Sequence, residues 1–534
     1  MVTKNIKLLD CTLRDGGYVN DWNFGESTIS CVFERLVNAG IDVIEIGFLD
    51  DRRPFDPNRT IQPNTKCYDE MFAGCDKGDS MVVAMIDYGT CDISNIGPCE
   101  ESFLDGIRII FKKPKMKGAV EYARQIKEKG YKVFLQLVSI TAYEDRDLLD
   151  LIDLANEAGV YAVSMVDTYG LMHKDDMLHY FNLLNKNLHP DMIIGYHSHN
   201  NFQLGYANEI EMIQQKTMRT LSVDGTVYGM GKSAGNAPLE LLALYLNENC
   251  GTGYDMDQIL EIIDVNIMRI YKEHYWGYSL LFYLAASNDC HPNYISYLLD
   301  KHTLSVKAIN DIAGSIEKVK KLDYDKVYIE QLYQHYQEQT LFESGNLETL
   351  KAELSGKCIL LLGPGRSLVT EDDRIKEYIA DHAPAVISVN CVPKSYSPDY
   401  VFIGNAKRYS MLFRAFKNLQ ETCKVIATSN ISSVGKPFDY VFSYDSVCGE
   451  DSMLSDNALV MVIKTMMMAD CSEVTLAGFD GFSQQSVENY YDEYMDFTAD
   501  YDQLSKVNEK IKEFIRTLDG QIKINFLTAS KYER

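Results

Sequence analysis

The sequence lacks several features that would each define a class of protein. It has no apolar run near the roughly 18 residues of a membrane span, and its first residues lack the apolar core of a signal peptide. It has no surplus of positive charge: 52 Lys and Arg stand against 77 Asp and Glu, a net charge of −25. A nucleic-acid partner needs a basic surface. We therefore expect neither a membrane nor a nucleic acid as partner.

The cysteines also lack a pattern. The 13 cysteines form no CxxC pair and follow no regular spacing. Such usage is typical of reduced thiols in a cytoplasmic protein. The chain of 534 residues, 46% of them hydrophobic, is too long for one core. Changes in pattern predict three parts: a barrel over residues 1–262, a helical extension over 263–350 with a connector at 346–355, and an α/β domain over 351–534.

Short apolar strands alternate with amphipathic helices in the first part. Buried parallel strands have this apolar, β-branched composition, and eight such units in about 250 residues are typical of a (β/α)8 TIM barrel. A doubly wound open sheet is the alternative. The expected strands are residues 6–12, 42–48, 81–87, 106–111, 132–139, 162–168, 193–199 and 219–227.

Polar residues gather at the carboxyl ends of these strands, the face where barrel enzymes carry their active sites. They are Asp15, Glu45, Asp87, Arg108, Gln136, Asp167, His197, His199 and Asp224. Residues i and i+2 of a strand point to the same side, so His197 and His199 can aim two imidazoles at one point. Imidazole is the commonest side-chain metal ligand. With the Asp15 carboxylate at the same face, this pattern favours a metal site.

Three separated motifs carry a family resemblance: Thr12-Leu13-Arg14-Asp15-Gly16-Gly17, His197-Ser198-His199-Asn200 and Gly229-Met230-Gly231-Lys232-Ser233-Ala234-Gly235-Asn236-Ala237-Pro238. Together they resemble the HMG-CoA-lyase-like (DRE-TIM) metal-dependent barrels, most of all 4-hydroxy-2-oxovalerate aldolase. The resemblance implies that Asp15, His197 and His199 bind Mn or Mg, that Asn236 adds a ligand, and that Arg14 faces the substrate oxygen. It implies a carbon–carbon lyase or aldolase that splits a 4-hydroxy-2-oxo acid into pyruvate and an aldehyde, or joins them, and a homo-oligomer.

One departure affects the proton transfer. The aldolases carry a histidine base shortly after the Arg-Asp pair, where this chain has Tyr18. A phenol with a pKa near ~10 is a poor base at neutral pH. Tyr18, His173 and His291 are candidates for the missing group, and Tyr278 and Tyr283 lie in the segment that gives the aldolases a catalytic tyrosine. A Claisen-type acyltransferase using an acyl-CoA and a non-catalytic, degenerate barrel are the alternative functions.

A glycine-rich turn, Gly363-Pro364-Gly365-Arg366-Ser367, follows a buried strand in the last part. Such a turn can point backbone N–H groups at a phosphate, although it can also be needed for steric reasons. Residues 355–480 resemble the Rossmann-like nucleotide-binding scaffold of bacterial sialyltransferase-like proteins. That resemblance implies that Gly363, Gly365, Ser367, Asn390 and Asn405 lie near a nucleotide or nucleotide-sugar. A long helix over about 486–518 is expected to close this open sheet.

Overall fold

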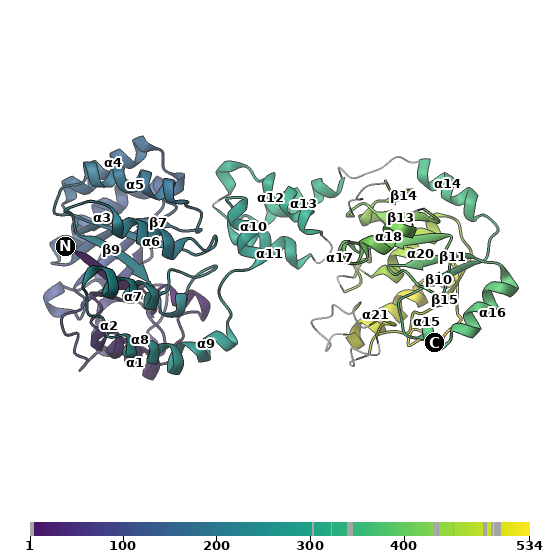
Figure 1. Ribbon diagram of the computed structural model, residues 1–534, viewed down its shortest axis with the longest axis horizontal. Coiled ribbons are helices and arrows are strands. Elements are labelled where there is room, and N and C mark those ends of the chain that lie inside the picture. Colours follow the sequence, from purple (N-terminus) through teal and green to yellow (C-terminus); the bar gives the residue numbers. More distant parts are fainter. Residues whose placement is uncertain are drawn as a thin grey trace. The chain divides into compact units, whose positions relative to one another are not determined.

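The computed structural model describes residues 5–533, apart from 302–303, 322, 339–344, 420, 432, 434–436, 452, 456, 484–488, 493–494 and 496–503 (Figure 1). The chain divides into two compact units, residues 1–292 and 293–534. No helix within the described ranges has the length and apolar composition that a membrane crossing needs.

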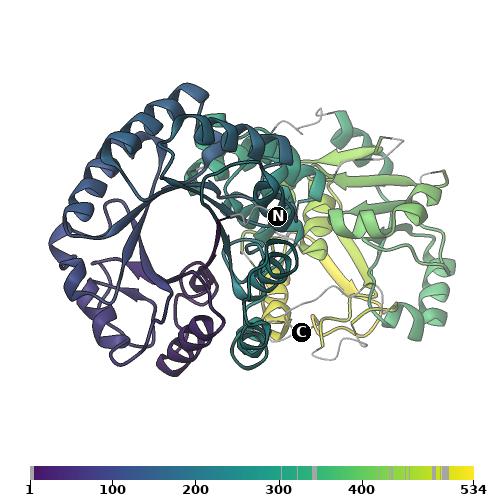
Figure 2. The same cartoon turned by 60° about the vertical axis from the view of Figure 1, so that its left-hand side comes forward.

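The first unit contains a closed parallel barrel, which Figure 2 shows as a ring of strands surrounded by helices. The order β1-β9-β8-β7-β6-β5-β4-β2 closes where β1 pairs with β2. The predicted (β/α)8 fold is confirmed. The barrel strands are β1 (Ile6–Asp10), β2 (Val43–Leu49), β4 (Met81–Asp87), β5 (Gly106–Phe111), β6 (Lys132–Leu137), β7 (Ala162–Asp167), β8 (Ile193–Ser198) and β9 (Leu221–Gly225), and β3 (Ile61–Gln62) pairs beside β2.

Amphipathic helices cover the outside of the barrel. In α1 the buried side chains are Ile29, Val32, Phe33 and Leu36, the i, i+3, i+4, i+7 spacing that places apolar groups on one helical face. The barrel strands themselves are buried along almost their whole length. The covering helices are α1 (Glu26–Asn38), α2 (Thr65–Met71), α3 (Met116–Glu128), α4 (Asp145–Ala158), α5 (Lys174–Asn187), α6 (Gly205–Gln214) and α7 (Leu239–Cys250).

Helices follow the barrel, as expected for residues 263–350. In the first unit these are α8 (Met256–Ile262), a π-helical turn (Ile263–Ile267), α9 (Met268–Glu273) and α10 (Leu280–Ser287). The second unit begins with α11 (Pro292–Asp300), α12 (Val306–Gly314), α13 (Lys326–Glu338) and α14 (Gly345–Leu354). The connector predicted at 346–355 is wrong, because α14 occupies it. Leu350 and Leu354 of this helix are buried in the core of the second unit.

A parallel sheet forms the centre of the second unit, with the order β14-β13-β12-β11-β10-β15-β16. The direction of progression reverses between β10 and β15, as in open doubly wound sheets, and the predicted open α/β sheet is confirmed. Its strands are β10 (Ile359–Leu362), β11 (Ala385–Val389), β12 (Tyr400–Ile403), β13 (Lys424–Thr428), β14 (Tyr440–Phe442), β15 (Glu473–Ala477) and β16 (Lys523–Phe526).

The helices of this unit are α15 (Ser367–Thr370), α16 (Asp372–His382), α17 (Ala406–Met411), α18 (Phe413–Leu419), α19 (Tyr444–Val447), α20 (Ala458–Met468) and α21 (Leu504–Thr517). The predicted helix over 486–518 is correct only for its last part. Residues 489–492 are not helical, since the Asn489 side chain bonds the backbone of Ser483 and the Tyr491 N–H donates to the Pro364 carbonyl at 3.0 Å. Residues 496–503 lie outside the described residues.

Candidate active site

Three buried side chains converge at the carboxyl end of the barrel strands. Asp15 follows β1, while His197 and His199 lie at the end of β8 and just beyond it. One ligand atom of each residue lies within 4.8 Å of those of the other two, the only such group of potential metal ligands among the described residues. The Nε2 atoms of His197 and His199 lie 3.9 and 4.0 Å from the Asp15 Oδ2 atom. The alternation of side chains along β8 thus has the predicted result.

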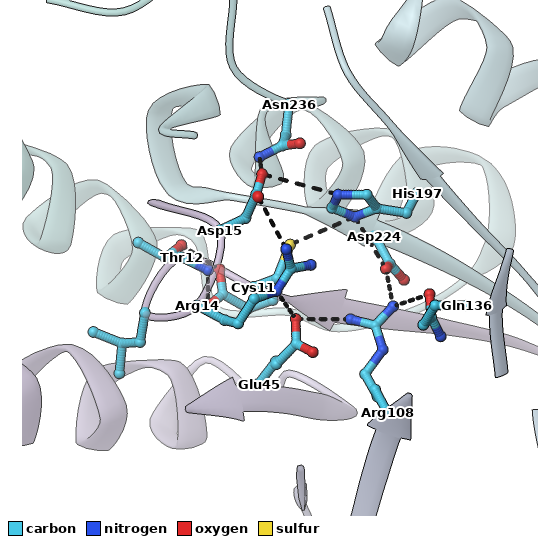
Figure 3. A network of polar contacts seen from close by, with 12 residues as sticks. Cys11, Thr12, Arg14, Asp15, Glu45, Arg108, Gln136, His197, Asp224 and Asn236 are labelled. Carbon is cyan, nitrogen blue, oxygen red and sulfur yellow. Dashed lines mark hydrogen bonds and ion pairs between the residues drawn. The ribbon is translucent and has the colours of Figure 1, made fainter. Parts of the chain in front are cut away.

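Two acceptor atoms around this group are unsatisfied. The Nε2 atom of His197 and the Oδ1 atom of Asn236 are buried and have no hydrogen-bond partner. Asn236 donates through its Nδ2 atom to Asp15, and the two side chains lie beside each other in Figure 3. A buried polar atom without a partner is costly, at about 1–3 kcal/mol. A divalent cation coordinated by nitrogen and oxygen donors would satisfy both atoms, so this donor set fits a metal ion.

A series of ion pairs holds Asp15 in position. The Arg14 Nη1 atom lies 2.9 Å from Asp15 Oδ1, and its Nε atom lies 2.6 Å from Glu45 Oε2. Arg108, which is fully buried, places its Nη1 atom 2.8 Å from the same Glu45 oxygen (Figure 3). The positions of Arg14 and Asp15 are therefore fixed by charges on neighbouring strands.

Arg108 is also linked to His197, through Asp224. Its Nη2 atom bonds Asp224 and donates to Gln136 Oε1 at 3.0 Å. Asp224 in turn places Oδ2 3.3 Å from His197 Nδ1. Two guanidinium groups, Arg14 and Arg108, thus face three carboxylates, Asp15, Glu45 and Asp224. With all five groups charged the network has one surplus negative charge, which suits a cation.

The protonation states also suit metal binding. Burial opposes ionisation of Asp15, but Arg14 and then the two histidines bring the pKa of its carboxyl well below the usual value. Burial lowers the pKa of His199 to about 4. Metal ligands must be deprotonated. At neutral pH the Asp15 carboxylate and the His199 imidazole are therefore already deprotonated, and neither has to release a proton when a metal ion binds.

Comparison with known proteins agrees with this geometry. Residues 5–265 match the family model described as HMGL-like. The barrel belongs to the HMGL-like family. This assignment confirms the resemblance found in the three sequence motifs.

Several curated proteins are similar to about half of this chain. Oxaloacetate decarboxylase from Mycobacterium tuberculosis is 26% identical over 48% of this chain and 74% of its own length. 4-Hydroxy-2-oxovalerate aldolase from Shewanella woodyi is 24% identical, over 45% and 69%. 2-Isopropylmalate synthase from Sulfolobus acidocaldarius is 26% identical, over 48% and 64%. Among solved structures, hydroxymethylglutaryl-CoA lyase from Pseudomonas aeruginosa has a TM-score of 0.42 and 17% identity, over 51% of this chain and 93% of that one.

A cavity of about 80 Å³ opens onto the candidate metal ligands of the HMGL-like barrel. Arg14, Gln136, Tyr18 and Lys232 line it together with Asp15, His197 and His199. The Tyr18 ring packs edge-on against Trp22, with centroids 4.7 Å apart. Loss of solvent around the phenol, and then the charge of Asp15, raise the pKa of Tyr18 well above its usual value. Tyr18 therefore stays protonated at neutral pH.

The other candidates from the sequence do not line this cavity. Tyr278 and Tyr283 are exposed, at 54% and 43%. His173 caps α5 and stacks on Phe202. His291 packs edge-on against Tyr169. Conversely, Lys232 lines the cavity. Its motif does not predict this, because the surrounding glycine-rich sequence does not indicate which residues the lysine side chain contacts.

In the second unit a cavity of about 170 Å³ lies where the strand order reverses. Gly365, Asn390 and Asn405 line it, together with Arg408, whereas Gly363 and Ser367 do not. The backbone N–H groups of the glycine-rich turn are used within the fold. Gly363 donates to the Ala477 carbonyl and Gly365 to the Gly478 carbonyl, both at 2.7 Å. Ser367 donates its N–H to Asp480 Oδ2 at 2.7 Å.

Proposed function

We propose that the HMGL-like barrel is a divalent-metal-dependent carbon–carbon lyase or aldolase that acts on a 2-oxo acid. One observation carries the proposal: Asp15, His197 and His199 place ligand atoms within 4.8 Å of one another, beside two buried acceptors that have no partner. The relatives support it, because their names include an aldolase and a decarboxylase of 2-oxo acids. The substrate we favour is a 4-hydroxy-2-oxo acid, which would give pyruvate and an aldehyde.

Asp15, His197 and His199 would hold the ion, Mn²⁺ or Mg²⁺, and Asn236 would add its Oδ1 atom. Such an ion would supply Lewis-acid chemistry toward the keto group of the substrate. Arg14 supplies a second positive charge at the same place, and Glu45 and Asp15 fix its direction. Cleavage of the C3–C4 bond releases the 4-hydroxyl proton and the aldehyde, and C3 then takes up a proton. A preorganised guanidinium is well suited to the charge that develops on the 2-oxo acid fragment.

Tyr18 contributes to this scheme as a hydrogen-bond donor. Its raised pKa keeps the phenol protonated, so it cannot take the hydroxyl proton as a phenolate at neutral pH. Its ring lies against Trp22 and Phe48 and lines the cavity. We propose that it orients an oxygen of the substrate.

The test is exchange of the methyl protons of pyruvate in D2O with Mg²⁺ or Mn²⁺, followed by proton NMR, because this step needs no knowledge of the aldehyde. The wild-type protein should exchange the protons and retain one metal ion after dialysis. Asp15→Ala and His197→Ala should lose both properties. Exchange that survives in metal-free buffer, or in Asp15→Ala, would contradict the proposal.

We propose separately that the cavity of the second unit binds a nucleotide or a nucleotide-sugar. Asn390, Asn405 and Gly365 line it as the sequence predicts, and Arg408 adds a positive charge. Arg408 also lies 4.9 Å from the Tyr490 ring centroid, so an aromatic face lies at the same wall. Calorimetric titration of the full chain with nucleoside mono- and diphosphates tests the proposal, and absence of binding by every member would overturn it.

A further inference from the structure

Lys232 lies on a loop that is pressed against the metal ligands. The neighbouring Gly231 has no room for a side chain, since a Cβ atom there would lie 2.2 Å from Asn236 Nδ2 and 2.8 Å from Asp15 Oδ2. The Lys232 carbonyl accepts a hydrogen bond from His199 Nδ1, at 3.2 Å. The backbone position of Lys232 is thus fixed by the same residues that form the candidate metal site.

The side chain of Lys232 turns toward the cavity. Its Nζ atom lies 5.4 Å from the centroid of the Tyr18 ring, in the range of a cation–π contact. The ring is held in turn by Trp22 and Phe48. Both Lys232 and Tyr18 line the cavity, together with Asp15, His197 and His199, so the ammonium group lies beside the candidate metal site.

This ammonium group has no carboxylate partner. In the part of the chain that the structure describes, no Asp or Glu oxygen lies within 4.0 Å of Lys232 Nζ, although the chain carries 25 more acidic than basic side chains. Burial lowers the pKa of Lys232, against the opposing charge of Asp15, which lies beyond ion-pair distance; the positive charges of Lys112 and Arg14 act in the same direction as burial. A partly buried cation without a partner is unfavourable. An anion that enters the cavity would relieve this cost.

Arg14 and Arg108 neutralise two of the three carboxylates of the site, and the divalent ion of the proposed function would more than offset the third. Arg14 bonds Asp15 and Glu45, and Arg108 bonds Glu45 and Asp224. In the proposed function, the carboxylate next to the keto group would be neutralised by the positive charge that remains on the divalent ion. Lys232 is therefore a cation in excess of what a simple 2-oxo acid such as pyruvate requires.

Resting on that proposed function, we propose that Lys232 binds a second anionic group, a carboxylate or a phosphoryl group, on the part of the substrate farthest from the keto group. Lys112, exposed just after β5, adds positive potential to the same region. The carboxylate of Asp87, at the end of β4, interacts with Lys115, Lys112 and Arg52 and offsets part of this potential. The preferred substrate of the barrel is thus a 2-oxo acid with an anionic tail.

Pairs of ligands with the same carbon skeleton test this assignment by calorimetric titration of the Mn²⁺-loaded full chain. 2-Oxovalerate is compared with 2-oxoglutarate, and 2-oxohexanoate with 2-oxoadipate, so each pair differs only in a terminal carboxylate. In at least one pair the dianion should bind tenfold or more tightly than the monoanion. Lys232→Met should remove this preference, Lys232→Arg should retain most of it, and Lys117→Met, at an exposed position of α3, should keep all of it.

Equal affinity within both pairs, or a preference that survives in Lys232→Met, would overturn the assignment. A uniform loss for all ligands in Lys232→Met would also overturn it, because it would mean that the ammonium only holds Tyr18 in place. The phosphonate analogue of 2-oxoglutarate distinguishes the two anions: tighter binding than 2-oxoglutarate assigns a phosphoryl group, and weaker binding a carboxylate. A separate Mn²⁺ titration shows which proposal fails, since a wild-type protein that binds no Mn²⁺ contradicts the proposed function itself.

Discussion

The Nδ1 atom of His197 lies 3.3 Å from the Oδ2 atom of Asp224, and this contact turns the His197 Nε2 atom toward Asp15. A carboxylate behind a metal-binding histidine fixes its tautomer and raises its basicity. Asp224 itself is held by the fully buried Arg108. One ligand of the proposed ion is therefore oriented by residues from two other strands, β5 and β9.

Asp224→Asn should weaken Mn²⁺ binding by about 10- to 100-fold, the usual effect of losing such a support. The variant should also unfold more easily, by about 3 kcal/mol, because Arg108 loses one partner of a buried ion pair. A Mn²⁺ titration followed by electron paramagnetic resonance measures the first effect and chemical denaturation the second. Asp150→Asn, at an exposed position of α4, is the control and should change neither. Unchanged Mn²⁺ affinity in Asp224→Asn would rule out the supporting role.

Tyr18→Phe should reduce turnover of a 4-hydroxy-2-oxo acid by no more than about tenfold and should leave the pH profile unchanged. The reason is that the raised pKa of Tyr18 keeps its proton in place at neutral pH, whereas a true general base contributes about 10²- to 10⁴-fold. Pyruvate release measures the effect. A loss of more than 100-fold, with a shifted pH profile, would show that the phenol takes part in proton transfer.

Tyr18→His restores the residue type that the aldolase branch carries at this place. An imidazole with a pKa near ~6.5 can accept the hydroxyl proton at neutral pH. We expect aldol cleavage to rise by about tenfold or more between pH 7 and 8, with a new acid limb in the profile. Tyr18→Asn, of similar polarity but without a titrating group, is the control. If both variants respond alike, the base lies elsewhere.

The barrel and the convergence of Asp15, His197 and His199 could be predicted because they depend on local rules. Alternation along a strand fixes that His197 and His199 face one side, and parallel strands bring their carboxyl ends together. Asp15 joins them because its strand is hydrogen-bonded to β9 and β2. Each of these relations can be read from the spacing of residues in the chain.

The role of Lys232 could not be predicted, because it depends on where a loop places one ammonium group relative to charges from distant segments. The helix α14 was missed for a related reason: it is short, and only its packing through Leu350 and Leu354 shows that it is part of the core. The glycine-rich turn offered N–H groups to a phosphate, but Asp480, 113 residues away from Ser367, accepts one of them. Tertiary contacts decide such cases.

Asp10 should give the barrel a stability that depends on pH. Burial raises the pKa of its carboxyl to about 7, and the neighbouring Glu45 and Asp224 add to the effect. The folded state therefore retains a proton that the unfolded chain releases near pH 4. The stabilisation is complete below about pH 4, falls by about 1.4 kcal/mol per pH unit as the pH rises, and is gone above about pH 7.

Asp10→Asn should remove this dependence. An asparagine can still accept the Thr12 N–H bond, which is 3.0 Å long, and its amide can replace the contact with the Thr12 hydroxyl. The difference in free energy of unfolding between wild type and variant, measured by denaturation at several pH values, should decline between pH 5 and 7 and level off above pH 8. A constant difference would show that Asp10 is ionised in the folded state throughout.

Asn405→Ser should separate the fold of the second unit from its proposed ligand site. The Asn405 side chain accepts the Arg408 N–H at 2.9 Å and so caps α17, and serine caps a helix equally well. The amide nitrogen makes no hydrogen bond to the described residues, so the variant loses only a donor in the cavity wall. We expect nucleotide affinity to fall by about tenfold with little change in stability.

Ser367→Ala should have the opposite effect, because the Ser367 hydroxyl bonds Asp480 and Thr528 and does not line the cavity. We expect this variant to lose about 1–2 kcal/mol of stability and to keep its nucleotide affinity. If Ser367→Ala weakens binding and Asn405→Ser does not, the ligand lies at the glycine-rich turn after all.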